Sequence, residues 1–322
     1  MVILRDSSES IGAVDEVLSG AGRRAPGVVR VTAWEKFPWL KAGFSTRQGG
    51  GSMLYSEGDV GEQNLGWTAE DIAATVAENR RRFVRAVAGT DAPELVTVRQ
   101  FHSGMARLVE RGARPLSTAE GKAVLRGDGL MTRERGMLLG VQTADCVPVL
   151  IADTRTRVVA AFHAGWRGTL ARIVERGVGT MRMEFGSRPK DLVAAVGPSI
   201  GPCCFAVGEE VRSEFESQFA YVAKLFSEVY DSDPVREKYP MLFLTARAPG
   251  HSNIGPQIHL DLWEANRRQL LDAGLREKAI SVVGECTACA RFKNGRRKYF
   301  SHRAEHGYTG RMLSVIGVAA HR

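Results

Sequence analysis

The sequence predicts an α+β domain built on mixed sheets. Short apolar runs typical of buried strands far outnumber the long helical patterns, and the two do not alternate regularly as in a doubly wound parallel sheet. The 322 residues are 44% hydrophobic and 25% charged, which is typical of a soluble globular protein. This length suits one large domain or two ordinary ones, and because no linker divides the chain we expect a single domain.

Strands are expected wherever apolar and β-branched residues form a short run. The predicted strands are residues 28–31, 42–46, 95–102, 129–132, 138–143, 147–152, 158–163 and 192–196. Helices are expected where the pattern has helical spacing, at residues 69–88, 169–185 and 260–275, and a shorter one begins near Gly208. Asp261 and Gly274 are suited to the start and end of the helix at 260–275.

Two segments stand apart from this domain. Residues 1–35 form a polar, glycine-containing N-terminal extension that we expect to be partly flexible. Residues 229–257 are rich in turn-forming residues and predict a surface insertion. The remaining part of residues 36–322 is expected to fold as one domain.

Composition limits the partners. The formal net charge is +8, but the basic residues are scattered, which favours solubility and some attraction for anions over a nucleic-acid surface. We find neither a signal peptide nor the ~20 apolar residues of a membrane span. The five cysteines are an odd number without disulfide-framework spacing, so we expect a reducing compartment and a cytoplasmic location.

Cys146 and His163 are expected to meet across a hairpin. They flank two apolar runs joined by the polar stretch Asp153–Thr156, and a reversal at Thr154 and Arg155 places them directly opposite each other. Opposed residues on one face of an antiparallel pair have Cβ atoms roughly 4.5–5.5 Å apart. A thiolate and an imidazole at that distance can share a metal ion or form a nucleophile–base pair, and both residues can equally be ordinary core residues.

His102 adds a third candidate ligand, because it ends the predicted strand 95–102 and can approach the hairpin from a neighbouring strand. Zinc accepts nitrogen and sulfur ligands, and catalytic sites usually combine three protein ligands with an open position. His102, Cys146 and His163 meet that count.

A second metal pattern lies near the C-terminal end. Cys286 and Cys289, followed by His302 and His306, have the spacing of a zinc finger. The context argues against a finger, because Gly295 interrupts the segment that should form its helix. We therefore expect no finger and no nucleic-acid binding there.

The loop at residues 197–205 contains the adjacent residues Cys203 and Cys204. Adjacent side chains diverge, so we do not expect the pair to bind one ion together and assign both a structural role. Trp166, which follows His163 closely, can line a pocket for a flat ring, although core packing is the commoner use of tryptophan.

The glycine-rich segment at residues 43–51 is a candidate anion site. Its backbone N–H groups and Arg47 can hold an anion, although an ordinary hairpin end has the same composition. It is not a Walker A loop, because no Gly-Lys-Ser/Thr follows.

Together these motifs resemble the bacterial laccase-domain family, whose members are also described as multicopper polyphenol-oxidase-like proteins, purine nucleoside phosphorylases or peptidoglycan editing factors. The most specific motifs are Ala-Asp-Cys at residues 144–146 and His-Ala-Gly-Trp-Arg-Gly at residues 163–168. The match runs in order over about residues 36–322, and its other motifs are residues 44–47, 64–66, 100–102, 197–204, 259–262, 300–303 and 309–311. The chain departs from the family in having His302 where tyrosine is usual.

The resemblance implies one catalytic domain with zinc held by His102, Cys146 and His163, and copper as the alternative metal. It also implies a layered α/β/β/α fold similar to the catalytic domain of cytotoxic necrotizing factor toxins. Those toxins use a Cys–His pair for hydrolysis, so a metal-free role for Cys146 and His163 stays open.

The function implied by the resemblance is phosphorolysis of adenosine, inosine and methylthioadenosine, together with hydrolytic deamination of adenosine by water that zinc activates. The partners would then be a purine nucleoside and phosphate. We expect Arg47 and Arg167, and less strongly Arg303, to bind phosphate. We also expect Asn64 to contact the substrate and Asp145 to transfer a proton. In a regular strand, however, the side chain of Asp145 would point to the face opposite that of Cys146.

Two alternatives remain open. One is a cytosolic amidase that edits peptidoglycan precursors of the UDP-muramyl-amino acid type, whose anionic substrate also suits the positive charge. The other is a copper-dependent polyphenol oxidase, for which seven histidines are few. A monomer and a homodimer are both compatible with the sequence.

Overall fold

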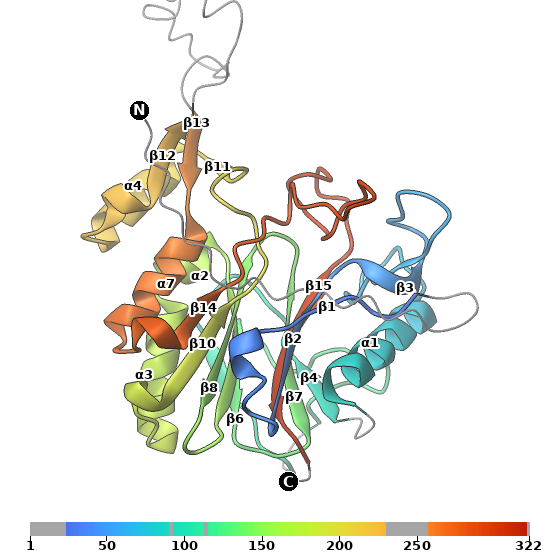
Figure 1. Ribbon diagram of the computed structural model, residues 1–322, viewed down its shortest axis with the longest axis horizontal. Coiled ribbons are helices and arrows are strands. Elements are labelled where there is room, and N and C mark those ends of the chain that lie inside the picture. Colours follow the sequence, from blue (N-terminus) through green and yellow to red (C-terminus); the bar gives the residue numbers. More distant parts are fainter. Residues whose placement is uncertain (1–23, 90–92, 113–114, 230–256, 321–322) are drawn as a thin grey trace, which may run out of the picture.

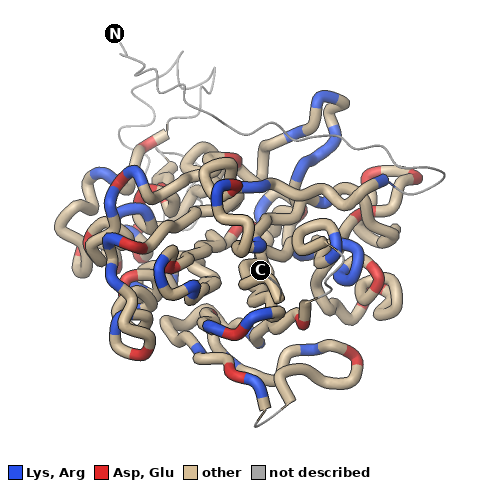
Figure 2. Tube along the Cα trace, turned by 60° about the horizontal axis from the view of Figure 1, so that its bottom comes forward, with Lys and Arg blue, Asp and Glu red and all other residues tan. Residues whose placement is uncertain are grey.

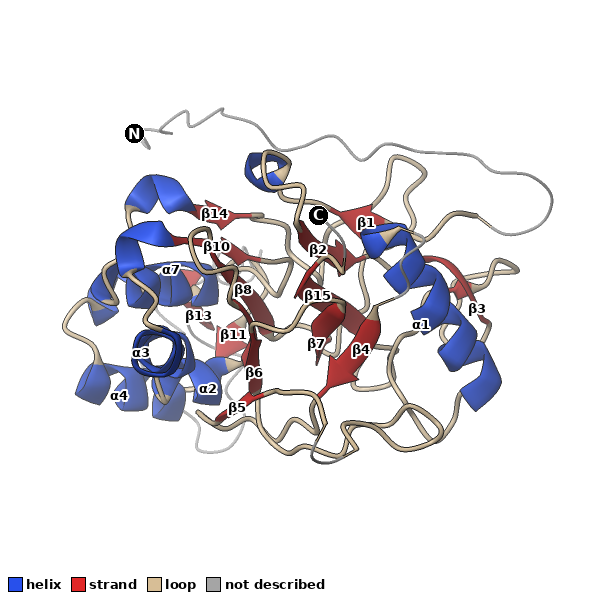
Figure 3. Ribbon diagram, turned by 90° about the horizontal axis from the view of Figure 1, so that it is seen from below, coloured by secondary structure: helices blue, strands red, loops and turns tan. Residues whose placement is uncertain are grey.

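Two β-sheets pack face to face at the centre of the computed structural model, which describes residues 24–89, 93–112, 115–229 and 257–320. Helices cover the outer side of each sheet, so the layers run helix, sheet, sheet, helix (Figures 1 and 3). This arrangement confirms the predicted α+β class with mixed sheets.

The first sheet has β15 at its centre. In spatial order its strands are β1 (Val28–Val29), β2 (Leu40–Ser45), β15 (Met312–Val318), β7 (Met137–Thr143) and β4 (Glu94–Thr97). β15 pairs antiparallel with both β2 and β7, whereas β4 runs parallel to β7. Helix α1 (Ala73–Ala88) covers the outer face, where Phe83 and Val84 pack with Leu313 and Val315.

The second sheet carries most of the site. Its strands in spatial order are β14 (Ile280–Val282), β10 (Leu192–Val196), β8 (Val147–Asp153), β9 (Val159–Ala164), β6 (Gly129–Thr132) and β5 (Ala106–Leu108). The outer face packs against α2 (Trp166–Leu170), α3 (Ile173–Phe185) and α7 (Leu262–Asp272). The inner faces of the two sheets share one apolar core, which includes Leu139 and Leu150.

A small third sheet, next to α4 (Glu209–Gln218), lies beyond one end of these layers (Figure 1). Its strands are β11 (Ala206–Val207), β13 (Gln257–Leu260) and β12 (Phe226–Val229), and the remaining strand, β3 (Gln48–Ser52), follows β2. None of the helices in the described ranges combines the length and the hydropathy that a membrane span needs. Figure 2 shows basic and acidic residues interspersed along the trace, as the scattered charges of the sequence predicted.

Two predicted elements end or break earlier than expected, and each contains a residue with a positive φ. The strand expected to reach His102 ends at Thr97, and His102 itself has a φ of 62°. The helix expected at 169–185 is divided into α2 and α3 by Arg172, whose φ is 55°. The third predicted helix begins as expected, because the carboxylate of Asp261 accepts the N–H of Glu264.

The β8–β9 hairpin has a register two residues away from the predicted one. Pro148, not Cys146, lies opposite His163. The connecting loop is longer than expected, because the carboxylate of Asp153 accepts two backbone N–H groups within it. A shift of two residues keeps every side chain on the same face of the sheet, so the predicted approach of Cys146 and His163 is not lost.

The folded domain begins before residue 36. β1 pairs with β2, and Trp34 is buried, so residues 28–35 pack on the domain instead of belonging to an extension. Residues 1–23 and 230–256 lie outside the described residues, and with them most of the predicted extension and insertion.

Candidate functional site

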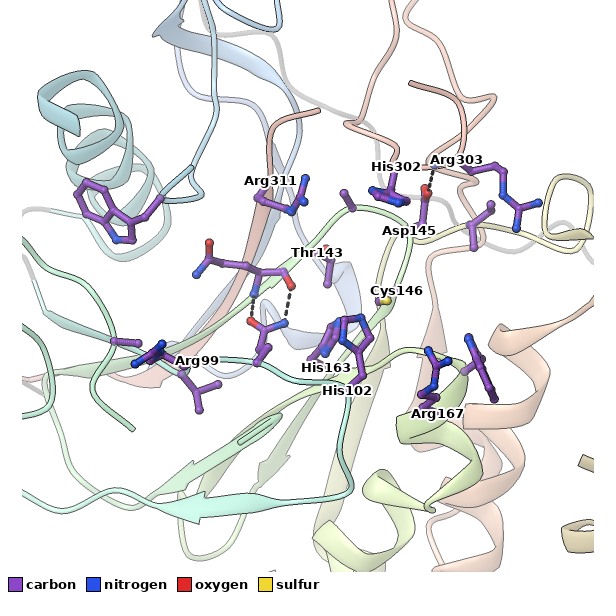
Figure 4. Close-up of a pocket in the computed structure, with 18 of the residues that line it drawn as sticks. Arg99, His102, Thr143, Asp145, Cys146, His163, Arg167, His302, Arg303 and Arg311 are labelled. Atoms are coloured by element: carbon purple, nitrogen blue, oxygen red, sulfur yellow. Dashed lines mark hydrogen bonds between the residues drawn. The ribbon is translucent and has the colours of Figure 1, made fainter. Parts of the chain in front are cut away.

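Three side chains from separate segments meet at one end of the central sheets. His102 lies in the loop after β4, Cys146 lies immediately before β8, and His163 lies on β9. The Cys146 sulfur and one ring nitrogen of each histidine lie within 4.8 Å of one another. Figure 4 shows the three side chains close together in the pocket. The structure therefore brings together the three residues that the sequence predicted as metal ligands.

Asp128, which the sequence analysis missed, connects the two histidines. Its buried carboxylate lies 2.9 Å from Nδ1 of His163 and accepts the backbone N–H groups of His102 at 3.0 Å and Ser103 at 2.7 Å. A carboxylate on Nδ1 fixes the tautomer and orientation of the ring and leaves Nε2 for a metal ion or a proton. The available signal was an aspartate between two glycines directly before a buried strand.

Electrostatics makes Cys146 and His163 a charged pair when no metal is bound. Burial alone would raise the pKa of the Cys146 thiol. The charge of His163 and hydrogen bonds from both histidines outweigh this effect of burial and lower the pKa to about 6. Burial would lower the pKa of His163, but the Cys146 thiolate and Asp128 outweigh it and raise the pKa above its usual value. A thiolate held in this way is suited to metal binding or to nucleophilic attack.

The donor set fits zinc. Two imidazoles and one thiolate are ligands that zinc accepts, and three protein ligands leave one position open. The hydrogen bond from His163 to Asp128 is the contact that metal-binding histidines usually make behind the ring. Gly165 provides the space, because a Cβ at this residue would lie 2.8 Å from Sγ of Cys146.

Gly165→Ala is expected to displace the Cys146 sulfur and to lower the affinity for zinc by about tenfold or more. The backbone of Gly165 has a φ of −64°, which alanine adopts easily, so we expect little loss of fold. Zinc titration and thermal unfolding measure the two effects. Gly179→Ala is the matched control, because its Cβ would meet nothing within 4 Å. Equal zinc affinity in the Gly165 variant and the wild type would contradict the proposed crowding.

Asp145, which precedes Cys146, is held by three hydrogen bonds. Its carboxylate accepts the hydroxyl groups of Thr287 at 2.6 Å and Ser301 at 2.7 Å, and the backbone N–H of Arg303 at 2.7 Å. Its φ of 91° lies outside the strand geometry that the sequence suggested. This placement suits a residue that positions the loop before Cys146 better than one that transfers protons.

The three clustered side chains lie in the wall of a cavity of about 950 Å³, a volume typical of small-molecule sites. Asp145 is the one acidic side chain among the described residues that line it. The cationic lining residues are Arg99, Lys122, Arg167, Arg303 and Arg311, and the large aromatic ones are Trp67, Trp166 and Phe205. Such a lining suits an anionic ligand together with a flat ring.

Of the three arginines predicted to bind phosphate, Arg167 and Arg303 line the cavity and Arg47 does not. Arg47 is 1% exposed and pairs with Glu62 and Glu305, and it also donates to two backbone carbonyl groups. The glycine-rich segment after it forms β3 instead of an open anion loop. The predicted phosphate contact of Arg47 therefore has no geometric basis.

Asn64 is also buried away from the cavity. Its side-chain oxygen accepts the backbone N–H of Arg311 at 2.9 Å, and its amide group donates to Asp71. Asn64 therefore positions the segment that carries Arg311. Arg99 and Arg311 were not predicted as binding residues, although both lie in or beside motifs that the sequence shares with the laccase-domain family.

The zinc-finger spacing does not produce a finger. Residues 290–311 contain no helix in the described structure, and His302 lines the cavity. The four remaining cysteines gather instead, with Cys286 and Cys289 joined by Cys203 and Cys204. The expectation that the side chains of the adjacent cysteines diverge is therefore wrong, because the turn that carries them directs both sulfurs to the same cluster.

Comparison with known sequences gives relatives over most of the chain. The chain is 34% identical to the protein named purine nucleoside phosphorylase YlmD of Geobacillus stearothermophilus over 282 residues, which cover 87% of this chain and 91% of that protein. It is also 34% identical, over 202 residues, to a protein of an unknown prokaryotic organism named adenosine deaminase RL5. That match covers 62% of this chain and 68% of that protein.

Solved structures match the fold. The crystal structure of the YfiH protein of Bacillus licheniformis has a TM-score of 0.72 and 29% sequence identity, covering 91% of this chain and 96% of that one. The crystal structure of YlmD from Geobacillus stearothermophilus has a TM-score of 0.70 and 30% identity, covering 95% and 99%. A family model described as multi-copper polyphenol oxidoreductase laccase matches residues 41–319. The chain therefore belongs to this laccase-like family.

Proposed function

We propose that the protein is a zinc-dependent purine nucleoside enzyme, which cleaves adenosine, inosine and methylthioadenosine with phosphate and deaminates adenosine. The observation that carries the proposal is the cluster of His102, Cys146 and His163 in the wall of a cation-lined cavity. The names of the relatives, purine nucleoside phosphorylase and adenosine deaminase, support the same substrate class.

His102, Cys146 and His163 would hold the zinc ion. When bound, zinc supplies a Lewis acid that polarises an oxygen atom of substrate or water. Asp128 keeps the ring of His163 oriented, and Asp145 keeps the loop before Cys146 in place. Both acidic residues thus act by positioning the ligands.

The cationic lining would hold phosphate for attack on C1′ of the nucleoside. In phosphorolysis a phosphate oxygen bonds to C1′ as the purine leaves with the electron pair of the glycosidic bond, and positive charge develops on the ribose. Arg167 is exposed to the cavity and stacks on Trp166, with its guanidinium carbon 4.2 Å from the ring centroid. An arginine offers a fork of N–H groups that matches phosphate oxygens, and the neighbouring aromatic rings suit the purine.

Incubation of the purified protein with adenosine tests the proposal directly. We expect adenine and ribose 1-phosphate when phosphate is present, and inosine when it is absent, with each product identified by chromatography. Zinc content is measured on the same sample. Neither product from a zinc-loaded sample would contradict the proposed function.

Arg167→Met is expected to raise the KM for phosphate about 10- to 100-fold, because a charge-assisted hydrogen bond contributes roughly 1.5–3 kcal/mol. Deamination of adenosine needs no phosphate and should change less. Arg133→Met is the control, since Arg133 is exposed and does not line the cavity. An unchanged KM for phosphate in the Arg167 variant would exclude Arg167 as a phosphate ligand.

The second candidate is a cysteine amidase that edits UDP-muramyl-amino acid precursors. It is favoured by the alignment of Cys146, His163 and Asp128, since a nucleophile, a base and an orienting acid are the parts that such hydrolysis needs. An anionic precursor would also suit the cationic cavity. The two candidates differ in the role of His102, which is a ligand in the first and is not needed by the nucleophile–base pair in the second.

A further inference from the structure

The four cysteines outside the candidate active site form a second cluster. Cys203 and Cys204 lie in the turn before β11, and Cys286 and Cys289 lie in the turn after β14. All four sulfur atoms lie within 4.8 Å of one another. The fold thus gathers sulfurs from two segments that are far apart in the chain.

The separations suit one tetrahedral ion. Zinc–sulfur bonds of about 2.3 Å place two sulfurs of a tetrahedral site about 3.8 Å apart. The sulfurs of Cys203 and Cys289 are 3.7 Å apart, whereas a disulfide requires about 2.05 Å, and all four thiols are free.

Backbone donors support the sulfur of Cys286. The N–H of Gly201 lies 3.2 Å from it, and the N–H groups of Ala288 and Cys289 also point toward it. Backbone hydrogen bonds of this kind orient metal-binding thiolates and stabilise their charge. They are formed by the same two turns that carry the four cysteines, so the cluster is built into the local backbone.

We propose that Cys203, Cys204, Cys286 and Cys289 bind one zinc ion as a structural site. Four thiolates fill the tetrahedral coordination of zinc and leave no position for substrate, which is typical of structural sites. The cluster is formed by cysteines other than Cys146, so it is separate from the candidate active site and does not depend on the proposed reaction.

The ion would fasten two segments of the cavity wall. Ile200 and Phe205, which flank the adjacent cysteines, both line the cavity. Thr287, between the other two cysteines, donates its hydroxyl group to Asp145. Loss of the ion is therefore expected to loosen the loop that presents Cys146.

Metal analysis of variants tests the proposal. We expect about two zinc ions per chain in the wild type purified under reducing conditions, and about one in Cys289→Ser. Cys146→Ser removes a thiol from the other site and should lose only the other ion. Lys293→Ser changes an exposed residue in the loop after Cys289 and should keep both. If the active site holds no zinc, the wild type still contains one ion that Cys289→Ser removes.

Thiol titration of the wild type gives a second readout that needs no variant. We expect the four clustered cysteines to become reactive only after a chelator is added, together with a fall in Tm, and Cys146 to become the fifth reactive thiol if the active site also holds zinc. An unchanged zinc content in a folded Cys289→Ser variant would overturn the proposal. So would iron in place of zinc, or an intact mass showing a disulfide between Cys203 and Cys289.

Discussion

Cys146→Ala is expected to lower kcat/KM for both phosphorolysis and deamination by about a thousandfold or more. The substitution removes the only anionic ligand of the three-residue cluster and leaves two imidazoles, which bind zinc more weakly than a set containing a thiolate. Steady-state kinetics and metal analysis of the same sample measure both losses. The zinc ion proposed for the cluster of four cysteines serves as an internal reference, because it should remain in this variant.

His102→Ala separates the two candidate functions. If His102, Cys146 and His163 hold zinc, the His102→Ala variant should lose activity and zinc content as severely as Cys146→Ala does. If Cys146 is instead a nucleophile with His163 as its base, His102→Ala should retain much more activity.

Full zinc occupancy of the active site in Cys146→Ala would contradict the role of Cys146 as a zinc ligand. Copper in place of zinc in the wild type would favour an oxidoreductase, as the name of the family model suggests.

Asp128→Asn is expected to lower both zinc affinity and kcat/KM by about 10- to 100-fold. Asp128 faces donors on both oxygens, since Oδ1 meets Nδ1 of His163 and the N–H of His102 while Oδ2 meets the N–H and hydroxyl groups of Ser103. An amide would turn its own NH₂ group toward one set of donors. The unpaired donors should also lower the free energy of unfolding by about 1–3 kcal/mol.

Asp153→Asn is the matched control for this variant. Asp153 is equally buried, and its carboxylate accepts the N–H groups of Arg155 and Thr156 in the β8–β9 loop. Only Oδ1 of Asp153 accepts these bonds, and Oδ2 has no partner, so an amide can keep both. We therefore expect little loss of stability on chemical denaturation and an unchanged zinc affinity. Equal losses of zinc affinity in the two variants would show that removing any buried carboxylate has this effect and that Asp128 does not act by orienting His163.

Local patterns predicted the buried strands and helices well, because an apolar run bounded by turn residues is sufficient to identify them. The strands at 129–132 and 192–196 have the predicted bounds. β15 was missed although its residues form such an apolar run. Its place between β2 and β7 could not be predicted, because both partners lie far away in the chain and no local pattern reports that pairing. The hairpin register was wrong because a side chain, that of Asp153, determines the length of its loop.

In the candidate site, too, contacts within one hairpin could be predicted from the sequence and contacts between distant segments could not. Cys146 and His163 could be brought together from sequence because a single hairpin connects them. The contact between Asp128 and His163 could not be predicted in this way, because His163 lies 35 positions away on another strand. Composition alone also could not show that Arg47 points into a buried ion pair with Glu62 instead of toward an anion.

β15 is the central strand of the first sheet, yet it follows every other described strand in the chain. While the protein is being synthesised, β2 and β7 are complete long before their common neighbour leaves the ribosome. Each then presents an unsatisfied edge to which other extended chains can add. Crowded nascent chains, or chaperones that shield them, are therefore expected to influence the yield of this protein more than its final stability would suggest.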